Sequence, residues 1–261
     1  MSTISLTRIK GALLIAGTLL LAGTLQADEV RVMTSGGFAA PHLQRISPFE
    51  RATKHKVVTD ATSTGIGEDS IPSRLRRGEI VDVVILADAA LDELIKEGRV
   101  VAGSRVALAR SGIGMAVRAG APKPDISSVD ALRRALLQAK SVAYSAQVSG
   151  VYLSTELFPR LGIAAQMRAK SQRVERERVG AVVARGEAEI GFQQISELLP
   201  IGGIDYVGPL PAEVQRVTVF SAGVAVGAKS PEAARALIRF FMSPEGAQAM
   251  TNSGLEPMTQ R

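Results

Sequence analysis

The sequence predicts an α/β protein of two lobes, each a doubly wound and mostly parallel sheet, with a ligand cleft between the lobes. Two observations predict this fold. Short β-rich runs alternate with helical segments along most of the chain. Residues 81–86, Val-Asp-Val-Val-Ile-Leu, are almost continuously apolar, which is typical of a strand buried on both faces of a parallel sheet. Such sheets bind ligands outside the carboxyl ends of their strands, so the turns there are the first candidates for a site.

The first lobe is expected over residues 28–118. The first strand ends at Ser35-Gly36-Gly37, and apolar residues at helical spacing follow this small-residue turn. The same plan of strand, turn and helix then repeats. The expected strands are residues 30–34, 56–60, 81–86 and 113–117, and the expected helices are residues 38–55, 71–78 and 89–97.

The second lobe, expected over residues 119–215, repeats this order after a connection rich in proline, glycine and serine. Residues 216–261 are expected to return to the first lobe and to end in a pair of helices. Expected strands are residues 141–145, 189–193 and 217–226, and expected helices are residues 129–140, 151–161, 179–186, 231–242 and 244–253.

Residues 1–27 have the pattern of a cleavable secretory signal. Arg8 and Lys10 precede an apolar run at residues 11–23, and small residues lead to Ala27. The run is shorter than the roughly 20 residues of a membrane span. Because the chain contains no cysteine, a lipoprotein anchor, a disulfide and a thiolate metal site are all excluded. The sequence therefore predicts a periplasmic protein that is not an integral membrane protein.

The charge of the chain favours an anionic ligand. The net charge of +6 falls to +4 without Arg8 and Lys10, because 29 basic and 25 acidic residues remain. Nucleic-acid binding is not expected, because aromatic residues make up only 4% of the chain and the arginines are scattered among acids.

Four segments resemble the molybdate-binding-protein-like family of type II periplasmic binding proteins. They are residues 81–88, 107–110, 184–191 and 240–246, and the order of elements matches over nearly all of the chain after residue 27. Members of this family hold a tetrahedral oxyanion with hydroxyls and backbone N–H groups at helix N-termini, where the helix dipole favours negative charge. The resemblance implies matching roles for Ser35, Ser63 and the turn at residues 145–150.

This chain departs from the family pattern at three places. The first turn reads Ser35-Gly36-Gly37 where the family has Ser-Ala-Ser or close to it, and Gln194 stands where a tyrosine is expected. Residues 146–150 replace a proline-rich turn. The loss of two hydroxyl donors and the gain of glycines widen the anion cage, which favours a ligand larger than molybdate.

One histidine is the candidate catalytic residue. His42 is expected in the first turn of the helix after Ser35-Gly36-Gly37, where it would act as a general acid and base near neutral pH. The alternative is a solvent-facing histidine. Arg74 offers a guanidinium suited to a carboxylate. For Ser145 and Ser149 in the second-lobe turn, the alternative to ligand binding is simple helix capping. The candidate substrate-binding residues are Ser35, Gly36, Gly37, Ser63, Thr64, Arg74, Ser145, Ser149, Gly150 and Gln194.

Two functions fit these residues. Some relatives of the molybdate-binding group are periplasmic aconitate isomerases, which interconvert trans- and cis-aconitate without a cofactor, and the altered cage favours this activity. The alternative is the binding protein of an ABC importer for molybdate-like or organic oxyanions, which would dock on a membrane permease. The sequence shows no metal-ligand cluster. It also shows no phosphate loop, because Gly65-Ile66-Gly67 lacks the third glycine and the lysine of that motif. No cofactor is therefore expected.

Overall fold

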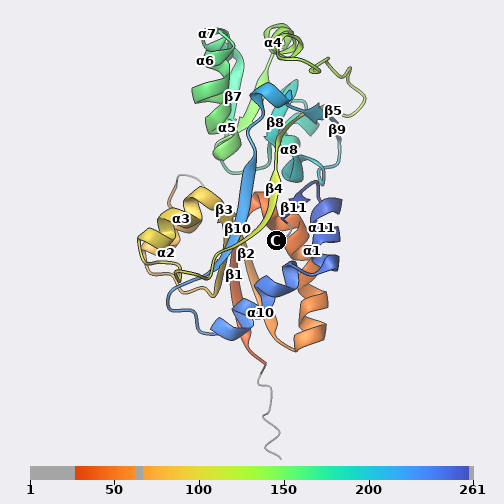
Figure 1. Cartoon of the computed structure of the whole chain (residues 1–261). Coiled ribbons are helices and arrows are strands. Elements are labelled where there is room, and N and C mark those ends of the chain that lie inside the picture. The colour runs from red at the N-terminus through yellow and green to blue at the C-terminus, as the bar shows by residue number, and fades with distance from the viewer. Residues whose placement is uncertain (1–26, 63–66, 259–261) are drawn as a thin grey trace, which may run out of the picture.

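Two mixed sheets, one in each lobe, form the frame of the protein (Figure 1). The computed structural model describes residues 27–62 and 67–258. The first sheet has the order β11 (Glu256–Pro257), β4 (Val106–Ser111), β10 (Thr218–Val224), β3 (Val83–Ala87), β1 (Glu29–Ser35) and β2 (Lys56–Thr62). The second has the order β7 (Ser171–Val174), β6 (Val142–Ser145), β8 (Ile190–Gln194), β5 (Ile113–Arg118) and β9 (Ile204–Pro209).

Each sheet has a parallel and an antiparallel half. In the first sheet β1 pairs in parallel with β2 and β3, whereas β10 is antiparallel to β3 and β4. In the second sheet β6 is parallel to β7 and β8, whereas β5 is antiparallel to β8 and β9. The sheets are mixed rather than mostly parallel, because the strand that enters each lobe from the other one runs against its neighbours.

The chain crosses between the lobes at Gly112 and again at residues 215–217. The first crossing lies earlier than the expected boundary after Arg118, because residues 113–118 pair with β8 and β9 of the second sheet. Gln215 joins the two crossings: its Oε1 accepts the N–H of Ile113 at 2.8 Å, and its Nε2 donates to the carbonyl of Ile113 at 3.0 Å.

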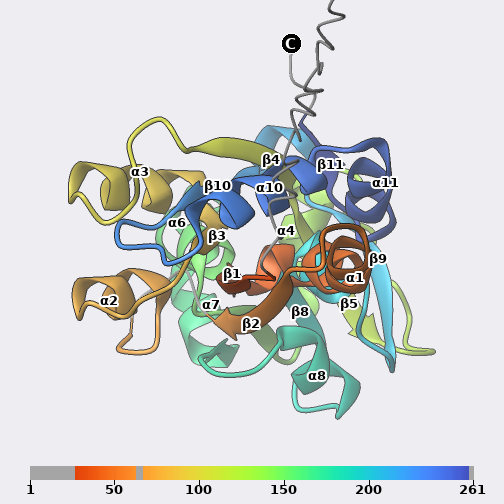
Figure 2. The same ribbon diagram turned by 90° about the horizontal axis from the view of Figure 1, so that it is seen from below.

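Helices cover both faces of the first sheet. One face carries α1 (Gly36–Thr53), α10 (Pro231–Phe241) and α11 (Pro244–Asn252), and the other carries α2 (Ile71–Arg76) and α3 (Asp88–Lys96). Figure 2 shows α2 and α3 on one side and α1 and α11 on the other. The alternation of β1 explains this, because Val30 and Val32 pack in one core and Met33 in the other.

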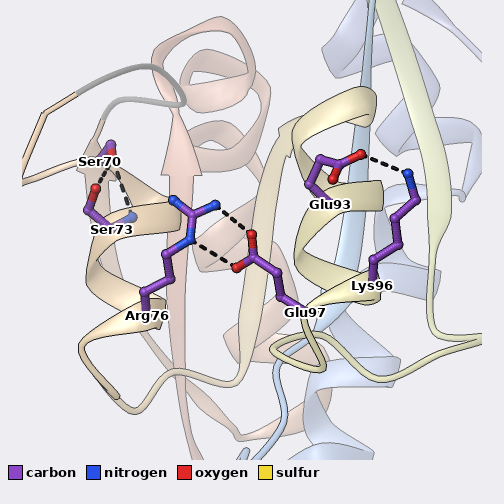
Figure 3. A network of polar contacts seen from close by, with 6 residues as sticks. All are labelled: Ser70, Ser73, Arg76, Glu93, Lys96 and Glu97. Carbon is purple, nitrogen blue, oxygen red and sulfur yellow. Dashed lines mark hydrogen bonds and ion pairs between the residues drawn. The ribbon is translucent and has the colours of Figure 1, made fainter.

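One ion pair ties α2 to the end of α3 on the outside of the first lobe (Figure 3). Arg76 donates to the Glu97 carboxylate from Nε at 2.9 Å and from Nη2 at 2.7 Å. Ser70 caps α2 by accepting the N–H of Ser73 at 3.3 Å. Because the side chains of Arg76 and Glu97 are 50% and 35% exposed, this pair adds little to the stability of the fold.

The second lobe has the same layers. One face of its sheet is covered by α4 (Val129–Gln138), α5 (Val148–Tyr152), the π-helical turn η1 (Leu153–Leu157), α6 (Phe158–Arg160) and α7 (Ala164–Lys170). The other face carries α8 (Val179–Ala184). Two short elements, α9 (Ile195–Leu198) and the 3-10 turn η2 (Ala212–Val214), follow β8 and β9. Among the described residues, no helix has the length and apolar character of a membrane span.

Candidate functional site

A cleft of about 510 Å³ lies between the two lobes, at the carboxyl ends of strands from both sheets. Its lining includes the last residues of five strands, which are Ser35 of β1, Ala87 of β3, Ser145 of β6, Val174 of β7 and Gln194 of β8. This is where doubly wound sheets bind their ligands. The volume suits a small organic molecule.

Two serines of the cleft, one from each lobe, have buried hydroxyls without a hydrogen-bond partner among the described residues. Ser35, only 3% exposed, precedes α1, and its side chain does not cap that helix. Ser149, 2% exposed, lies in the first turn of α5. A buried hydroxyl without a partner costs about 1–3 kcal/mol. Both hydroxyls are therefore suited to bind a ligand that enters the cleft.

The first turns of α1 and α5 add backbone donors beside these hydroxyls. Gly36 and Gly37, the first residues of the 18-residue helix α1, line the cleft, as does Val148 at the start of α5. The amides of a first helical turn have no partner within the helix, and the helix dipole there favours an anion.

Ser145 and Gly150 shape the second-lobe turn. The Ser145 hydroxyl accepts the N–H of Gln147 at 3.0 Å, so part of its bonding capacity serves the turn itself. A Cβ on Gly150 would lie 1.6 Å from the carbonyl oxygen of Ser145, so only glycine lets α5 pack this close to β6. The helix that was expected to start near residue 151 begins at Val148.

Gln194, which lines the cleft, forms hydrogen bonds with residues at both crossings. With its amide oriented so that both ends are satisfied, Nε2 donates to the carbonyl oxygens of Ser111 and Gly112, both at 3.2 Å, and Oε1 accepts the Thr218 hydroxyl at 2.9 Å. Because Ser111 and Thr218 flank the two crossings, Gln194 holds the lobes together at the base of the cleft.

A buried glutamate that the sequence analysis missed lies in this cleft. Glu197 is 8% exposed and sits in α9, directly after β8. Burial raises the pKa of its carboxyl to about 7, although the positive charge of Arg178 and a hydrogen bond with Gln193 act in the opposite direction. A carboxyl with this pKa exchanges protons readily near neutral pH. The only signal in the sequence was an acid one helical turn after the end of a buried strand.

The segment that carries Glu197 is held against both lobes. The N–H of Ile195 donates to the carbonyl of Gly112 at 3.0 Å. The Ser196 hydroxyl donates to the carbonyl of Gly37, in the first turn of α1, at 2.8 Å. These two bonds fix α9 between the first crossing and α1, and so fix the backbone from which the Glu197 side chain extends.

Two arginines supply positive charge to the cleft. Arg176 and Arg178 line it together with Glu175 and Glu177. The glutamates are neutralised by other residues, because Glu175 pairs with Arg173 at 3.1 Å and Glu177 with Arg185 at 2.8 Å. Arg176 and Arg178 form no salt bridge with any residue that the structure describes. Their guanidinium groups suit a carboxylate ligand.

The structure does not bring His42 into the cleft. Because α1 begins at Gly36, His42 is the seventh residue of the helix rather than part of its first turn. Its ring is fully buried, with Nε2 2.7 Å from the Thr59 hydroxyl and the ring centroid 5.6 Å from that of Phe241. Burial lowers the pKa of His42 to about 4. A histidine in this position belongs to the core of the first lobe.

Arg74 lies away from the cleft, and two further candidates cannot be placed in it or outside it. Arg74 does not line the cleft. Its guanidinium pairs instead with Asp60 at 2.5 Å and with Glu79. Ser63 and Thr64 lie outside the described residues. Within the described ranges, no group of three or more acidic or histidine side chains is placed to hold a metal ion.

Residues 30–256 match the family model of bacterial extracellular solute-binding proteins. The chain belongs to this family. The expected fold is confirmed by the periplasmic molybdate-binding protein of Azotobacter vinelandii, a solved structure with a TM-score of 0.71 and 20% identity that covers 89% of this chain and 100% of its own. The solute-binding fold accounts for the two lobes, the two crossings and the cleft between them.

Two relatives of this solute-binding protein carry names that differ in function. An aconitate isomerase from a Pseudomonas species is 46% identical over 228 residues, which are 87% of each chain. The molybdate-binding protein ModA of Azotobacter vinelandii is 29% identical over 240 residues, which are 88% of this chain and 90% of the relative. The isomerase is thus the more similar of the two over a nearly equal span.

Proposed function

We propose that this solute-binding protein is a cofactor-independent isomerase that converts trans-aconitate to cis-aconitate. The observation that carries the proposal is the 46% identity to an aconitate isomerase over 87% of both chains. The departures from the molybdate-binding pattern at Gly36, Gly37 and Gln194 favour the same activity, because they suit a ligand larger than a tetrahedral oxyanion.

The cleft offers donors for a ligand with three carboxylates. The unpaired hydroxyl of Ser35 and the first amides of α1 lie in one lobe, and the unpaired hydroxyl of Ser149 lies in the other. Arg176 and Arg178 add positive charge. A substrate held by both lobes would be fixed in one orientation, which an allylic proton transfer requires.

The reaction needs no external reactant. A proton leaves the methylene carbon of trans-aconitate, the double bond moves by one carbon, and a proton returns to the carbon that was vinylic. The negative charge of the enolate-like intermediate spreads onto a carboxylate, where helix N-terminal amides and hydroxyls stabilise it. The enzyme must also supply an acid and base that works near neutral pH.

The secretory signal predicted at residues 1–27 and the family both support a place of action outside the cytoplasm. We infer that residues 1–27 direct export and that the protein acts in the periplasm on a small anionic substrate, because the family comprises extracellular solute-binding proteins.

The test is to incubate the purified protein, without its leader, with trans-aconitate in deuterated buffer and to follow the mixture by proton NMR. We expect cis-aconitate to form with many turnovers per protein molecule. Saturable binding of trans-aconitate without conversion, or tight binding of molybdate, would instead assign the protein to transport, with an ABC permease as its partner.

A further inference from the structure

We propose that Glu197 is the catalytic residue that carries the proton between the two allylic carbons of the substrate. This role rests on the isomerase activity proposed above, and it adds the acid and base which that activity needs. Glu197 is the acidic residue of the described cleft that is buried, held in place and close to both lobes.

The position of the carboxyl is set by a contact across the cleft. A Cβ built on Gly36 would lie 2.3 Å from Glu197 Oε1 and 3.3 Å from its Cδ. The carboxyl of the second lobe therefore lies against the start of α1 in the first lobe, beside Ser35 with its unpaired hydroxyl. A substrate carboxylate held by Ser35 and the first turn of α1 would place its neighbouring carbon next to Glu197.

The other acids of the described cleft are less suited to this step. Asp69, Glu175 and Glu177 are all exposed, and the last two pair with Arg173 and Arg185. An exposed side chain is not held in one position against a bound substrate, and a guanidinium partner competes with the substrate for the carboxylates of Glu175 and Glu177. Glu197 differs because its burial raises the pKa of the carboxyl to about 7. An acid or base works best when its pKa lies near the pH of the reaction, because it can then both accept and donate a proton.

The step balances within the enzyme and the substrate. The Glu197 carboxylate removes a proton from the methylene carbon, and the electron pair of that C–H bond forms the new double bond. The electron pair of the old double bond then takes the proton back from the Glu197 carboxyl at the former vinylic carbon. Glu197 ends as it began, and the product is an isomer of the substrate. One group is enough because both carbons lie on the same three-carbon unit.

The experiment compares two glutamate-to-glutamine variants from the same cleft. Glu197→Gln keeps the shape of the side chain and its neighbour Gly36, but it cannot ionise. Glu175→Gln removes a carboxylate that is exposed and paired with Arg173. We expect kcat for trans-aconitate to fall by about 10²–10⁴-fold in Glu197→Gln, as is typical for the loss of a general base. Glu175→Gln should stay within about threefold of the wild type.

Binding and pH dependence separate catalysis from folding. Calorimetric titration of Glu197→Gln with trans-aconitate should still show saturable binding. The kcat/KM of the wild type and of Glu175→Gln should rise with pH to a plateau above about 7, because the Glu197 carboxylate is the reactive form. The positive charge of Arg178 lowers the pKa of Glu197 and so moves the rise in rate to lower pH. The other charged groups that line the cleft are Asp69, Glu175, Arg176 and Glu177.

A third variant keeps the proposal testable if Glu197→Gln does not fold. Glu197→Asp retains an ionisable carboxyl but withdraws it from Gly36, and should lose at least about tenfold in kcat while its rate still rises with pH. Wild-type kcat in either Glu197 variant would overturn the role of Glu197 and leave the isomerase activity standing. Absence of conversion by the wild type would overturn both proposals.

Discussion

The Glu197 carboxyl fills the space that a side chain at position 36 would occupy, with Oε1 2.3 Å from the place of a Cβ on Gly36. The two residues come from different lobes and are brought together by the hydrogen bond from Ser196 to the carbonyl of Gly37. Gly36 therefore matters for the absence of a side chain rather than for an unusual backbone conformation.

This contact predicts that Gly36→Ala lowers activity with little loss of stability. The atoms that the new methyl group meets are the end of a flexible side chain, so the Glu197 carboxyl turns away and the backbone keeps its place. A displacement of about 1 Å is enough to reduce kcat by about 100-fold. Kinetics and thermal unfolding of the same preparation check both parts.

The matched control for that variant is Gly202→Ala. Gly202 has a negative φ and no heavy atom within 4 Å of the place of a Cβ, so this change should alter neither the rate nor the unfolding temperature. If Gly36→Ala were as active as Gly202→Ala, the contact between position 36 and Glu197 would have no part in catalysis.

The raised pKa of Glu197 predicts a pH-dependent cost to stability. Its ordinary value is 4.5 and its value in the folded protein is about 7, so between these pH values the folded protein holds more protons than the unfolded chain. The free energy of unfolding then falls as pH rises, by about 3 kcal/mol for this group. Urea unfolding at pH 4.5 and pH 8 should therefore show Glu197→Gln gaining stability relative to the wild type as pH rises; a constant difference would contradict the shift.

The unpaired hydroxyls predict a different result for two serines of the cleft. Ser35→Ala and Ser149→Ala should raise the KM for trans-aconitate by about tenfold each, the value of a hydrogen bond to a charged group. Neither should lower the free energy of unfolding, because neither hydroxyl has a partner in the described structure. Ser145→Ala is the contrasting variant. Its hydroxyl accepts the N–H of Gln147, so it should lose stability.

The sequence could place those cleft residues whose position is determined by neighbouring residues, while their role in binding stays a prediction. Ser35, Ser145 and Ser149 follow β-rich runs, and the carboxyl ends of such strands meet in one cleft. The expected lobe boundary lies after the first crossing because no strand was expected at residues 106–111, which makes residues 113–117 the last expected strand of the first lobe. Only the pairing partners assign β4 and β5 to different sheets.

The features that the sequence missed depend on contacts between distant segments. Glu197 becomes a buried acid because α9 packs against the start of α1, about 160 residues earlier in the chain. Apart from its place one helical turn after a buried strand, nothing near Glu197 in the sequence indicates that burial. The misplacement of His42 has a local cause, because α1 begins at Gly36 and this start turns the ring into the core.

The buried ring of His42 predicts acid sensitivity without a role in catalysis. Its pKa falls from the ordinary value of 6.5 to about 4 in the folded protein, because burial opposes the charged form. The unfolded chain therefore binds more protons between these pH values, and the stability that the neutral ring contributes is lost as pH falls from 6.5 towards 4. The loss amounts to about 3 kcal/mol.

His42→Leu keeps an apolar group against Phe241 and removes the titration. Between pH 7 and pH 4.5 the variant should therefore lose less stability against urea than the wild type loses. Its kcat at pH 7 should match that of the wild type, whereas a loss comparable to that of Glu197→Gln would return the acid and base role to His42.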